Sequence, residues 1–131
     1  MKKILFIAFA LAMPVCLIIP QASAAESYNR VSEKTVKLVP GQKIVFQGRV
    51  RDGDEVLYRF KAVAGQSVTV AIVGRDADFS VSLNHGLDVE PIAQDTKSWT
   101  GKMPAEFNGQ CEIAVHSSYK LAAYSLDITV K

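Results

Sequence analysis

The stretch from Glu55 to Val73, EVLYRFKAVAGQSVTVAIV, constrains the fold more than any other part of the chain. It contains two runs in which apolar and polar residues alternate, with Gly65 between them. Alternation of period two, rich in β-branched and aromatic residues, is typical of β-strands with one buried face. The six largest apolar side chains would contribute roughly 9–18 kcal/mol gross if buried. The stretch therefore predicts two strands that form the centre of a core. The residues predicted to be buried are Val56, Tyr58, Phe60, Ala62, Val68, Val70 and Ile72.

Alternation of the same kind recurs along most of the chain, and turn-forming residues separate the segments. Short strands without helical periodicity are typical of a β-sandwich. The predicted fold class is all-β, an antiparallel β-sandwich of about seven or eight strands. The further strands are predicted at residues 35–39, 43–51, 78–83, 96–104, 110–116 and 124–131, with an irregular lead-in at 26–33 and a long loop at 84–95 that holds at most one edge segment.

Three glycine-containing pairs mark predicted turns. Pro40-Gly41 fits the two central positions of a type II turn, and Ala64-Gly65 separates the two runs of the central stretch. Asn108-Gly109 is a strong turn dipeptide directly before a predicted strand. We therefore expect the chain to reverse at each of these places.

The strand at 43–51 is predicted to form a hairpin with the strand that begins at Glu55. A three-residue loop from Asp52 to Asp54 pairs Val50 with Val56 and keeps apolar residues on one face. A two-residue loop would set Val50 opposite Glu55 and place a carboxylate on the apolar face, because a shift of one residue turns every side chain over. The longer loop is the predicted one.

The N-terminus has the features of a secretory signal peptide: Lys2 and Lys3, an apolar run from Ile4 to Ile19, and the small-residue site Ala22-Ser23-Ala24. A membrane anchor is the alternative, but the run is short and two prolines interrupt it. We predict a signal peptide at residues 1–24 and one β-sandwich domain at residues 25–131. The mature protein is expected to be periplasmic or secreted after export of the Gram-negative type, without a membrane segment.

Charge and cysteine content exclude several classes of protein. Lys2 and Lys3 are two of the 15 basic residues, so the predicted mature domain has 13 basic residues against 13 acidic ones. A neutral domain lacks the clustered basic footprint that nucleic-acid binding requires, so we expect no nucleic-acid partner.

Cys111 is the single cysteine after the predicted cleavage, so an intramolecular disulfide is excluded. Cys111 lies on the same face of the predicted strand as Ile113 and Val115, which predicts a buried, unreactive thiol.

The sequence contains no recognisable catalytic or cofactor-binding motif, so we predict neither an enzyme nor a bound cofactor. His116 is the last residue of a predicted strand, with its side chain on the outward phase, beside Ser117. Adjacent residues of a strand point to opposite faces, so a serine–histidine pair is disfavoured there. His116 is instead a candidate surface residue.

Two acidic turns form the weaker alternative of a calcium site. Asp52 and Asp54 in one turn, and Asp76 and Asp78 in another, would supply oxygen ligands if the two loops met. Aspartate in such positions more often caps its own turn through backbone hydrogen bonds. We favour the turn interpretation and predict no metal.

Aromatic and cationic residues in loops are the best candidates for partner contacts. Tyr119 and Lys120 lie in the short loop 117–121, outside any alternating run. Trp99 is in phase with Met103, which favours a role in the core over a contact role.

The runs YRFKAVAGQSVTVAI and DADFSVSL resemble the core of bacterial pre-peptidase C-terminal-like domains, which are small β-sandwiches. With the segment NGQCEIAV and the ending YSLDITVK, the chain from Ile44 to Lys131 looks more like the periplasmic inhibitors of goose-type lysozyme. Most matched positions are predicted core residues, which specify fold better than function. The chain departs from that family where Asn108-Gly109 replaces a serine–glycine pair, and where Cys111 replaces a tyrosine.

The resemblance implies a function and a set of contact residues. It implies an inhibitor of goose-type lysozyme, or of another cell-wall lytic enzyme, whose loops enter a cleft lined by carboxylates. Lys120 and the Asn108 amide would then donate hydrogen bonds. The alternative is a non-catalytic binding module for a sugar, calcium or an envelope protein. The candidate contact residues are Asn108, Gly109, His116, Tyr119 and Lys120.

Overall fold

The computed structural model describes residues 30–131, so the predicted signal peptide lies outside the described residues. This part of the chain forms nine strands. None of its residues belongs to a helix that is long and apolar enough to cross a membrane. The strands are β1 (Val31–Val36), β2 (Lys43–Val50), β3 (Glu55–Val63), β4 (Ser67–Val73), β5 (Ala77–Asn84), β6 (Val89–Thr96), β7 (Ser98–Lys102), β8 (Asn108–Ser117) and β9 (Ala122–Val130).

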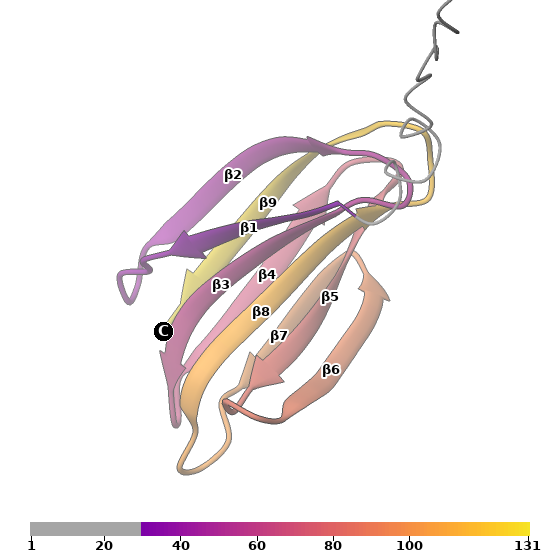
Figure 1. Cartoon of the computed structure of the whole chain (residues 1–131). Coiled ribbons are helices and arrows are strands. Elements are labelled where there is room, and N and C mark those ends of the chain that lie inside the picture. The colour runs from indigo at the N-terminus through magenta and orange to yellow at the C-terminus, as the bar shows by residue number, and fades with distance from the viewer. Residues whose placement is uncertain (1–29) are drawn as a thin grey trace, which may run out of the picture.

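The strands form two sheets that pack face to face (Figure 1). The five-stranded sheet has the order β1-β3-β8-β5-β6, and the four-stranded sheet has the order β2-β9-β4-β7. All neighbouring strands are antiparallel except β1, which runs parallel to β3. The predicted fold class, an all-β sandwich, is confirmed.

The core lies between the sheets and consists of the alternating residues that the sequence predicts. All seven apolar residues predicted to be buried in β3 and β4 are at most 8% exposed. Alternation also holds in β5, β8 and β9, where every second residue is buried. Trp99 is half-buried and packs against this core, as its phase predicts. The inward residues of β5, β8 and β9 are Ala77, Phe79, Val81, Leu83, Cys111, Ile113, Val115, Ala122, Tyr124, Leu126, Ile128 and Val130.

The predicted hairpin of β2 and β3 is wrong, because the two strands belong to different sheets. β2 pairs with β9, and β3 pairs with β1 and β8. The inward side chains of β2 and β3 therefore meet across the core and not side by side. The rings of Phe46 and Tyr58 lie 5.0 Å apart between their centroids. The connection reverses at Asp52 and Gly53, where the Asp54 amide donates to the Arg51 carbonyl at 3.0 Å, so a tight turn replaces the predicted three-residue loop.

The edges of the five-stranded sheet also differ from the prediction. Residues 31–36 form β1, which begins within the predicted lead-in at 26–33 and ends within the strand predicted at 35–39, and residues 89–96 form β6 where most of a long loop was expected. Both strands are largely exposed, so neither shows the clear alternation by which buried strands are recognised. Edge strands with one partner depend more on backbone pairing than on a hydrophobic pattern. β1 thus takes the place of the strand predicted at 35–39, and β6 raises the count from eight predicted strands to nine.

Two of the three predicted turns are confirmed. Gly41 and Gly65 adopt φ values of 84° and 81°, which favour glycine. In both turns the amide three residues along donates to the first carbonyl, Gln42 to Val39 at 3.0 Å and Gln66 to Val63 at 3.2 Å. The Asn108-Gly109 turn is wrong, because both residues belong to β8.

The strand connections gather at two opposite ends of the sandwich. We call the end with the β2–β3, β4–β5 and β8–β9 connections the Tyr119 end, and the end where β8 begins the Asn108 end. β8 spans the whole distance between them (Figure 1).

Candidate functional site

The five residues predicted to contact a partner do not form one site. His116, Tyr119 and Lys120 lie at or near the Tyr119 end, whereas Asn108 and Gly109 lie at the Asn108 end. Eight residues of extended strand separate Asn108 from His116, which is about 26 Å at the usual rise per residue. A single interface at one end of the sandwich can therefore include only one of the two groups.

The loop from Ser117 to Leu121, which we call the Tyr119 loop, is held by its own residues. The Ser117 hydroxyl donates to the Tyr119 carbonyl at 2.8 Å, and it accepts from the Tyr119 amide at 2.9 Å. Ser117 is 7% exposed, so burial fixes the position of this hydroxyl. The loop therefore closes around one buried side chain.

Both neighbouring connections also bind the Tyr119 loop. The Asp52 amide donates to the Tyr119 carbonyl at 3.0 Å, and the Ser118 amide donates to the Asp76 carbonyl at 3.1 Å. The loop is therefore tied to the β2–β3 turn on one side and to the β4–β5 turn on the other. Backbone groups fixed in this way lose little conformational freedom when a partner binds.

Apolar and cationic side chains project from this fixed loop. Tyr119 is 58% exposed and Leu121 is 47% exposed, and Lys120 between them is also exposed. Exposed aromatic residues next to a cation are typical of energetic anchors in protein interfaces. The Tyr119 loop is the best-formed contact surface among the predicted candidates.

His116 faces the outer surface of the five-stranded sheet and not the tip of the Tyr119 loop. Its Nε2 lies 2.6 Å from the Oδ1 of Asp95, which has a φ of 50° near the end of the edge strand β6. The histidine thus ties β6 to β8 across the intervening β5. This contact indicates a structural role for His116.

At the Asn108 end, Asn108 is exposed and Gly109 is packed. The reversal before β8 occurs at residues 104–107, where the Phe107 amide donates to the Pro104 carbonyl at 3.2 Å. A Cβ on Gly109 would overlap the backbone oxygen of Asn84 and lie 3.2 Å from the Phe107 ring. Glycine is thus required for close packing of chain segments and not for a turn. A surface depression of about 350 Å³ adjoins both Asn108 and Gly109.

The two acidic turns lie on either side of the Tyr119 loop, but their carboxylates do not converge. Asp78 forms an ion pair with Lys97 at 2.9 Å. Within residues 30–131, no three histidine, cysteine or acidic side chains are grouped so that they could hold a metal ion. Asp52, Asp54 and Asp76 belong to the two turns, and the Asp54 carboxylate accepts a hydrogen bond from the Arg30 amide at 3.4 Å.

We expect calcium to leave the stability of this protein unchanged, because Asp78 already has a cationic partner. Thermal unfolding in excess calcium and in excess chelator should give the same midpoint. A midpoint raised by calcium and restored by Asp52→Asn would instead establish a site in the acidic turns.

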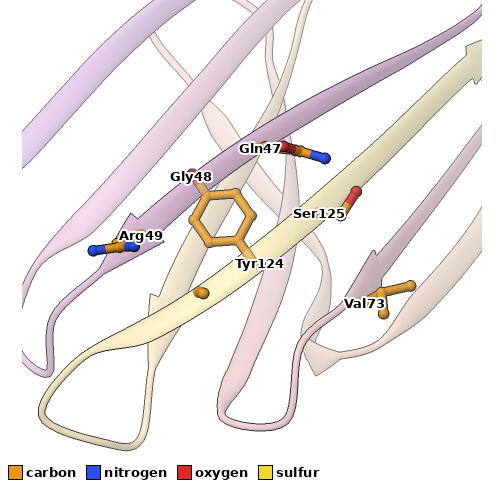
Figure 2. A pocket seen from close by; sticks show the side chains of 7 residues that line it. Gln47, Gly48, Arg49, Val73, Tyr124 and Ser125 are labelled. Atoms are coloured by element: carbon orange, nitrogen blue, oxygen red, sulfur yellow. The ribbon is translucent and has the colours of Figure 1, made fainter.

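Two surface depressions adjoin the Tyr119 end and share Gly48, Arg49 and Tyr124. The first has a volume of about 560 Å³ and lies along β2 and β9 (Figure 2). The second, about 390 Å³, lies between β1 and β2 and reaches Leu121 of the Tyr119 loop. In Figure 2 the Tyr124 ring extends from β9 toward Gly48, which has no side chain to cover it. We call the second depression the β1–β2 groove.

A pair of tyrosine hydroxyls lies beneath these depressions. The hydroxyl oxygens of Tyr58 and Tyr124 are 2.7 Å apart, and the two residues are 0% and 5% exposed. Burial raises the pKa of Tyr58 above its ordinary value. Burial, and then the hydrogen bond with Tyr58, raise the pKa of Tyr124. Both hydroxyls therefore remain protonated at neutral pH, and one of their two hydrogens forms the bond between them.

Solved structures show which known proteins share this architecture. PliG of Aeromonas hydrophila, a periplasmic inhibitor of g-type lysozyme, is 24% identical with a TM-score of 0.66, and the match covers 79% of this chain and 99% of PliG. PliG of Salmonella Typhimurium is 24% identical with a TM-score of 0.58, covering 76% of this chain and 98% of that protein. A Yersinia pseudotuberculosis-derived mitogen is 16% identical with a TM-score of 0.59, covering 71% and 88%. No protein-family model and no curated protein sequence matches the chain.

The chain has the fold of the PliG inhibitors. The resemblance recognised in the sequence is therefore confirmed at the level of the fold. Because a mitogen shares the same architecture, the fold alone does not assign the function. The function must be argued from the surface loops and grooves.

Sequence reasoning identified the Tyr119 loop but missed the grooves beside it. One signal was present: Gly48 interrupts a strand of apolar and charged residues, and glycine inside a strand often marks a close approach or an opening. The partner strand of Gly48 was wrongly assigned, so the opening over Tyr124 could not be foreseen.

Cys111 is a core residue with an unreactive thiol. It is 0% exposed, and burial, with a smaller contribution from the charge of Glu112, raises the pKa of its thiol to about 12. The thiolate is the reacting species, so the folded protein should not react with a disulfide reagent such as Ellman's reagent at pH 8. One equivalent should react after unfolding in guanidinium chloride. Rapid reaction of the folded protein would contradict this placement.

Proposed function

We propose that this protein is a periplasmic inhibitor of goose-type lysozyme and that the Tyr119 loop enters the cleft of the enzyme. Two g-type lysozyme inhibitors share its fold over nearly their whole length, which supports the class of partner. The observation that carries the proposed mechanism is the Tyr119 loop itself. It presents an aromatic and a cationic side chain on a backbone fixed by two neighbouring turns.

The charge of the loop suits a carboxylate-lined cleft. Lys120 lies at the exposed tip, and Arg51 is exposed at the start of the adjacent turn. A cation that meets a catalytic carboxylate forms a charge-assisted hydrogen bond and speeds association through long-range attraction. Tyr119 and Leu121 would bury apolar surface around that contact. The inhibitor would act by occupying the cleft and would perform no chemistry itself.

Inhibition of purified goose-type lysozyme by the purified exported protein tests this proposal. Increasing amounts of the protein should reduce the rate of cell-wall lysis to near zero, with saturation at a defined ratio of the two proteins. Hen egg-white lysozyme provides the comparison for selectivity. Full lytic activity of the goose-type enzyme in a large excess of the protein would overturn the proposal.

Lys120→Ala should weaken inhibition about tenfold, because it removes a hydrogen bond between charged groups. Lys61→Ala is the matched control, since Lys61 is exposed on the outer face of β3 toward the opposite end. Both variants should unfold at the wild-type temperature, and the inhibition constants are to be measured at one fixed salt concentration. Equal inhibition by the Lys120→Ala variant and the wild type would reject this loop as the contact site.

A further inference from the structure

The β1–β2 groove lies between the free edges of the two sheets. β1 is the last strand of the five-stranded sheet and β2 is the last strand of the four-stranded sheet, so neither has a second partner strand within residues 30–131. Side chains from both edges line the groove, together with Leu121 from the Tyr119 loop. Its volume of about 390 Å³ lies within the range of sites for small ligands.

Cations outnumber acids in this groove. Arg30, Lys34, Arg49 and Arg51 line it, against Asp54 and Glu55. Among residues 30–131, no carboxylate lies within the 4.0 Å of an ion pair from any of these four cations. By contrast, Arg59 on the outer face of the five-stranded sheet is paired with Glu33 at 3.1 Å. The groove thus concentrates unpaired positive charge on a domain whose predicted mature charge is close to neutral.

The groove also has a hydrogen-bond donor at its base. Tyr124 lines it, and its hydroxyl lies against Gly48, where a Cβ would be only 2.6 Å from the hydroxyl oxygen. Two phenols in contact share one hydrogen bond, so one of their two hydrogens is left to donate elsewhere. Lys34 lies above the ring of Tyr58, with its Nζ 5.8 Å from the ring centroid. A ligand in the groove would therefore meet a phenol from below and cations from the walls.

We propose that the β1–β2 groove binds the oxyanion of a small acidic ligand, either a carboxylate or a phosphate. Cations on both walls supply the attraction, and the Tyr124 hydroxyl donates a directed hydrogen bond. Val50, Val56 and Leu121 offer apolar surface for the uncharged part of the ligand. The groove shares Arg51 and Leu121 with the proposed contact with lysozyme, but anion binding in it does not depend on that contact.

The competing explanation is that these cations protect two exposed strand edges from pairing with other chains. Lysine and other charged residues on edge strands commonly serve that purpose. Edge protection requires charge but neither a hydrogen-bond donor at the base of the groove nor an opening above it. The two explanations differ in whether an anion binds saturably.

Titration of the purified exported protein followed by amide NMR tests the proposal, with the ionic strength held constant. The probes are inorganic phosphate, N-acetylmuramic acid and, as the uncharged comparison, N-acetylglucosamine. Saturable shifts confined to the groove strands with either anion, and none with N-acetylglucosamine, are expected. Response to phosphate alone would identify a free oxyanion as the ligand, and response to N-acetylmuramic acid alone would identify a sugar carboxylate.

Arg49→Gln should weaken binding of the responding anion about two- to fivefold, as expected for an exposed charge pair. Arg75→Gln is the matched control, because Arg75 is exposed at the Tyr119 end but does not line the groove.

Tyr124→Phe should weaken binding without altering the charge, provided that its far-UV spectrum shows a folded protein. Unsaturable shifts, equal shifts with N-acetylglucosamine, or an equal effect of the two arginine variants would overturn the proposal. Aggregation of Arg49→Gln without anion binding by the wild type would establish edge protection instead.

Discussion

Replacing Gly109 with alanine is expected to lower the free energy of unfolding by about 1–3 kcal/mol, the usual range for overpacking. The added Cβ would overlap the backbone oxygen of Asn84 and press on the ring of Phe107, which is 4% exposed. Neither neighbour can yield easily, because Asn84 is paired in β5 and Phe107 is enclosed by the core. Urea unfolding should show a lower midpoint with an unchanged slope. The thermal midpoint should fall by about 4–8 °C for each kcal/mol.

Asn108→Ala is the control for this substitution, because Asn108 is the preceding residue of the same strand and is exposed. It should leave the free energy of unfolding within about 0.5 kcal/mol of the wild-type value. Asn108 therefore allows the Asn108 end to be tested for inhibition without a change in stability. Wild-type stability of the Gly109→Ala variant would show that β5 and β8 are less closely packed here than the structure indicates.

The same pair of residues illustrates how a local pattern can mislead. Asn-Gly is a strong turn dipeptide when the two strands that flank it pair with each other. Here the preceding segment is the short turn at residues 104–107, and β8 extends through both residues to pair with β3 and β5. The requirement for glycine comes from a neighbouring strand, and a single sequence carries no record of which strand that is.

The buried half of the fold was predictable because its pattern is local. A residue of β3, β4, β5, β8 or β9 faces the core or solvent according to its parity, and the alternation of Tyr58 and Phe60 with Arg59 displays it directly. Which strands are neighbours is not shown by a local pattern, because it depends on segments that are distant in sequence. Val50 and Val56 fit either a hairpin or two facing sheets, because both arrangements bury the same side chains. The predicted hairpin therefore had the correct faces and the wrong partners.

Part of the candidate site was likewise predictable from local pattern, and part of it depends on long-range pairing. Tyr119 and Lys120 were predictable as exposed residues because they interrupt the alternation next to a strand end. The bonds that fix their loop come from Asp52 and Asp76, which are distant in sequence. The grooves depend on Gly48 lying opposite Tyr124, a pairing set by the sheet order. Long-range pairing thus creates the site, and the sequence shows only its components.

The tyrosine pair beneath the grooves leads to a second large prediction, an unequal cost of removing the two hydroxyls. Tyr124→Phe leaves the Tyr58 hydroxyl without a partner at a position that is 0% exposed, which should cost about 1–3 kcal/mol of stability. Tyr58→Phe leaves the Tyr124 hydroxyl, which lines both depressions and can bond to water. That substitution should cost about 0.5–1.5 kcal/mol, the net value of one hydrogen bond.

The double variant completes the test. With both hydroxyls removed, no polar group is left buried alone, so the loss of stability should be smaller than the sum of the two single losses. The three variants and the wild type, compared by urea unfolding at pH 7, form a double-mutant cycle that isolates the pair. Equal single losses would mean that Tyr124 is as enclosed as Tyr58, which would also remove the donor from the base of the β1–β2 groove. A larger loss for Tyr124→Phe, with partial recovery in the double variant, would locate the solvent-facing hydroxyl on Tyr124, where an oxyanion in the groove would meet it.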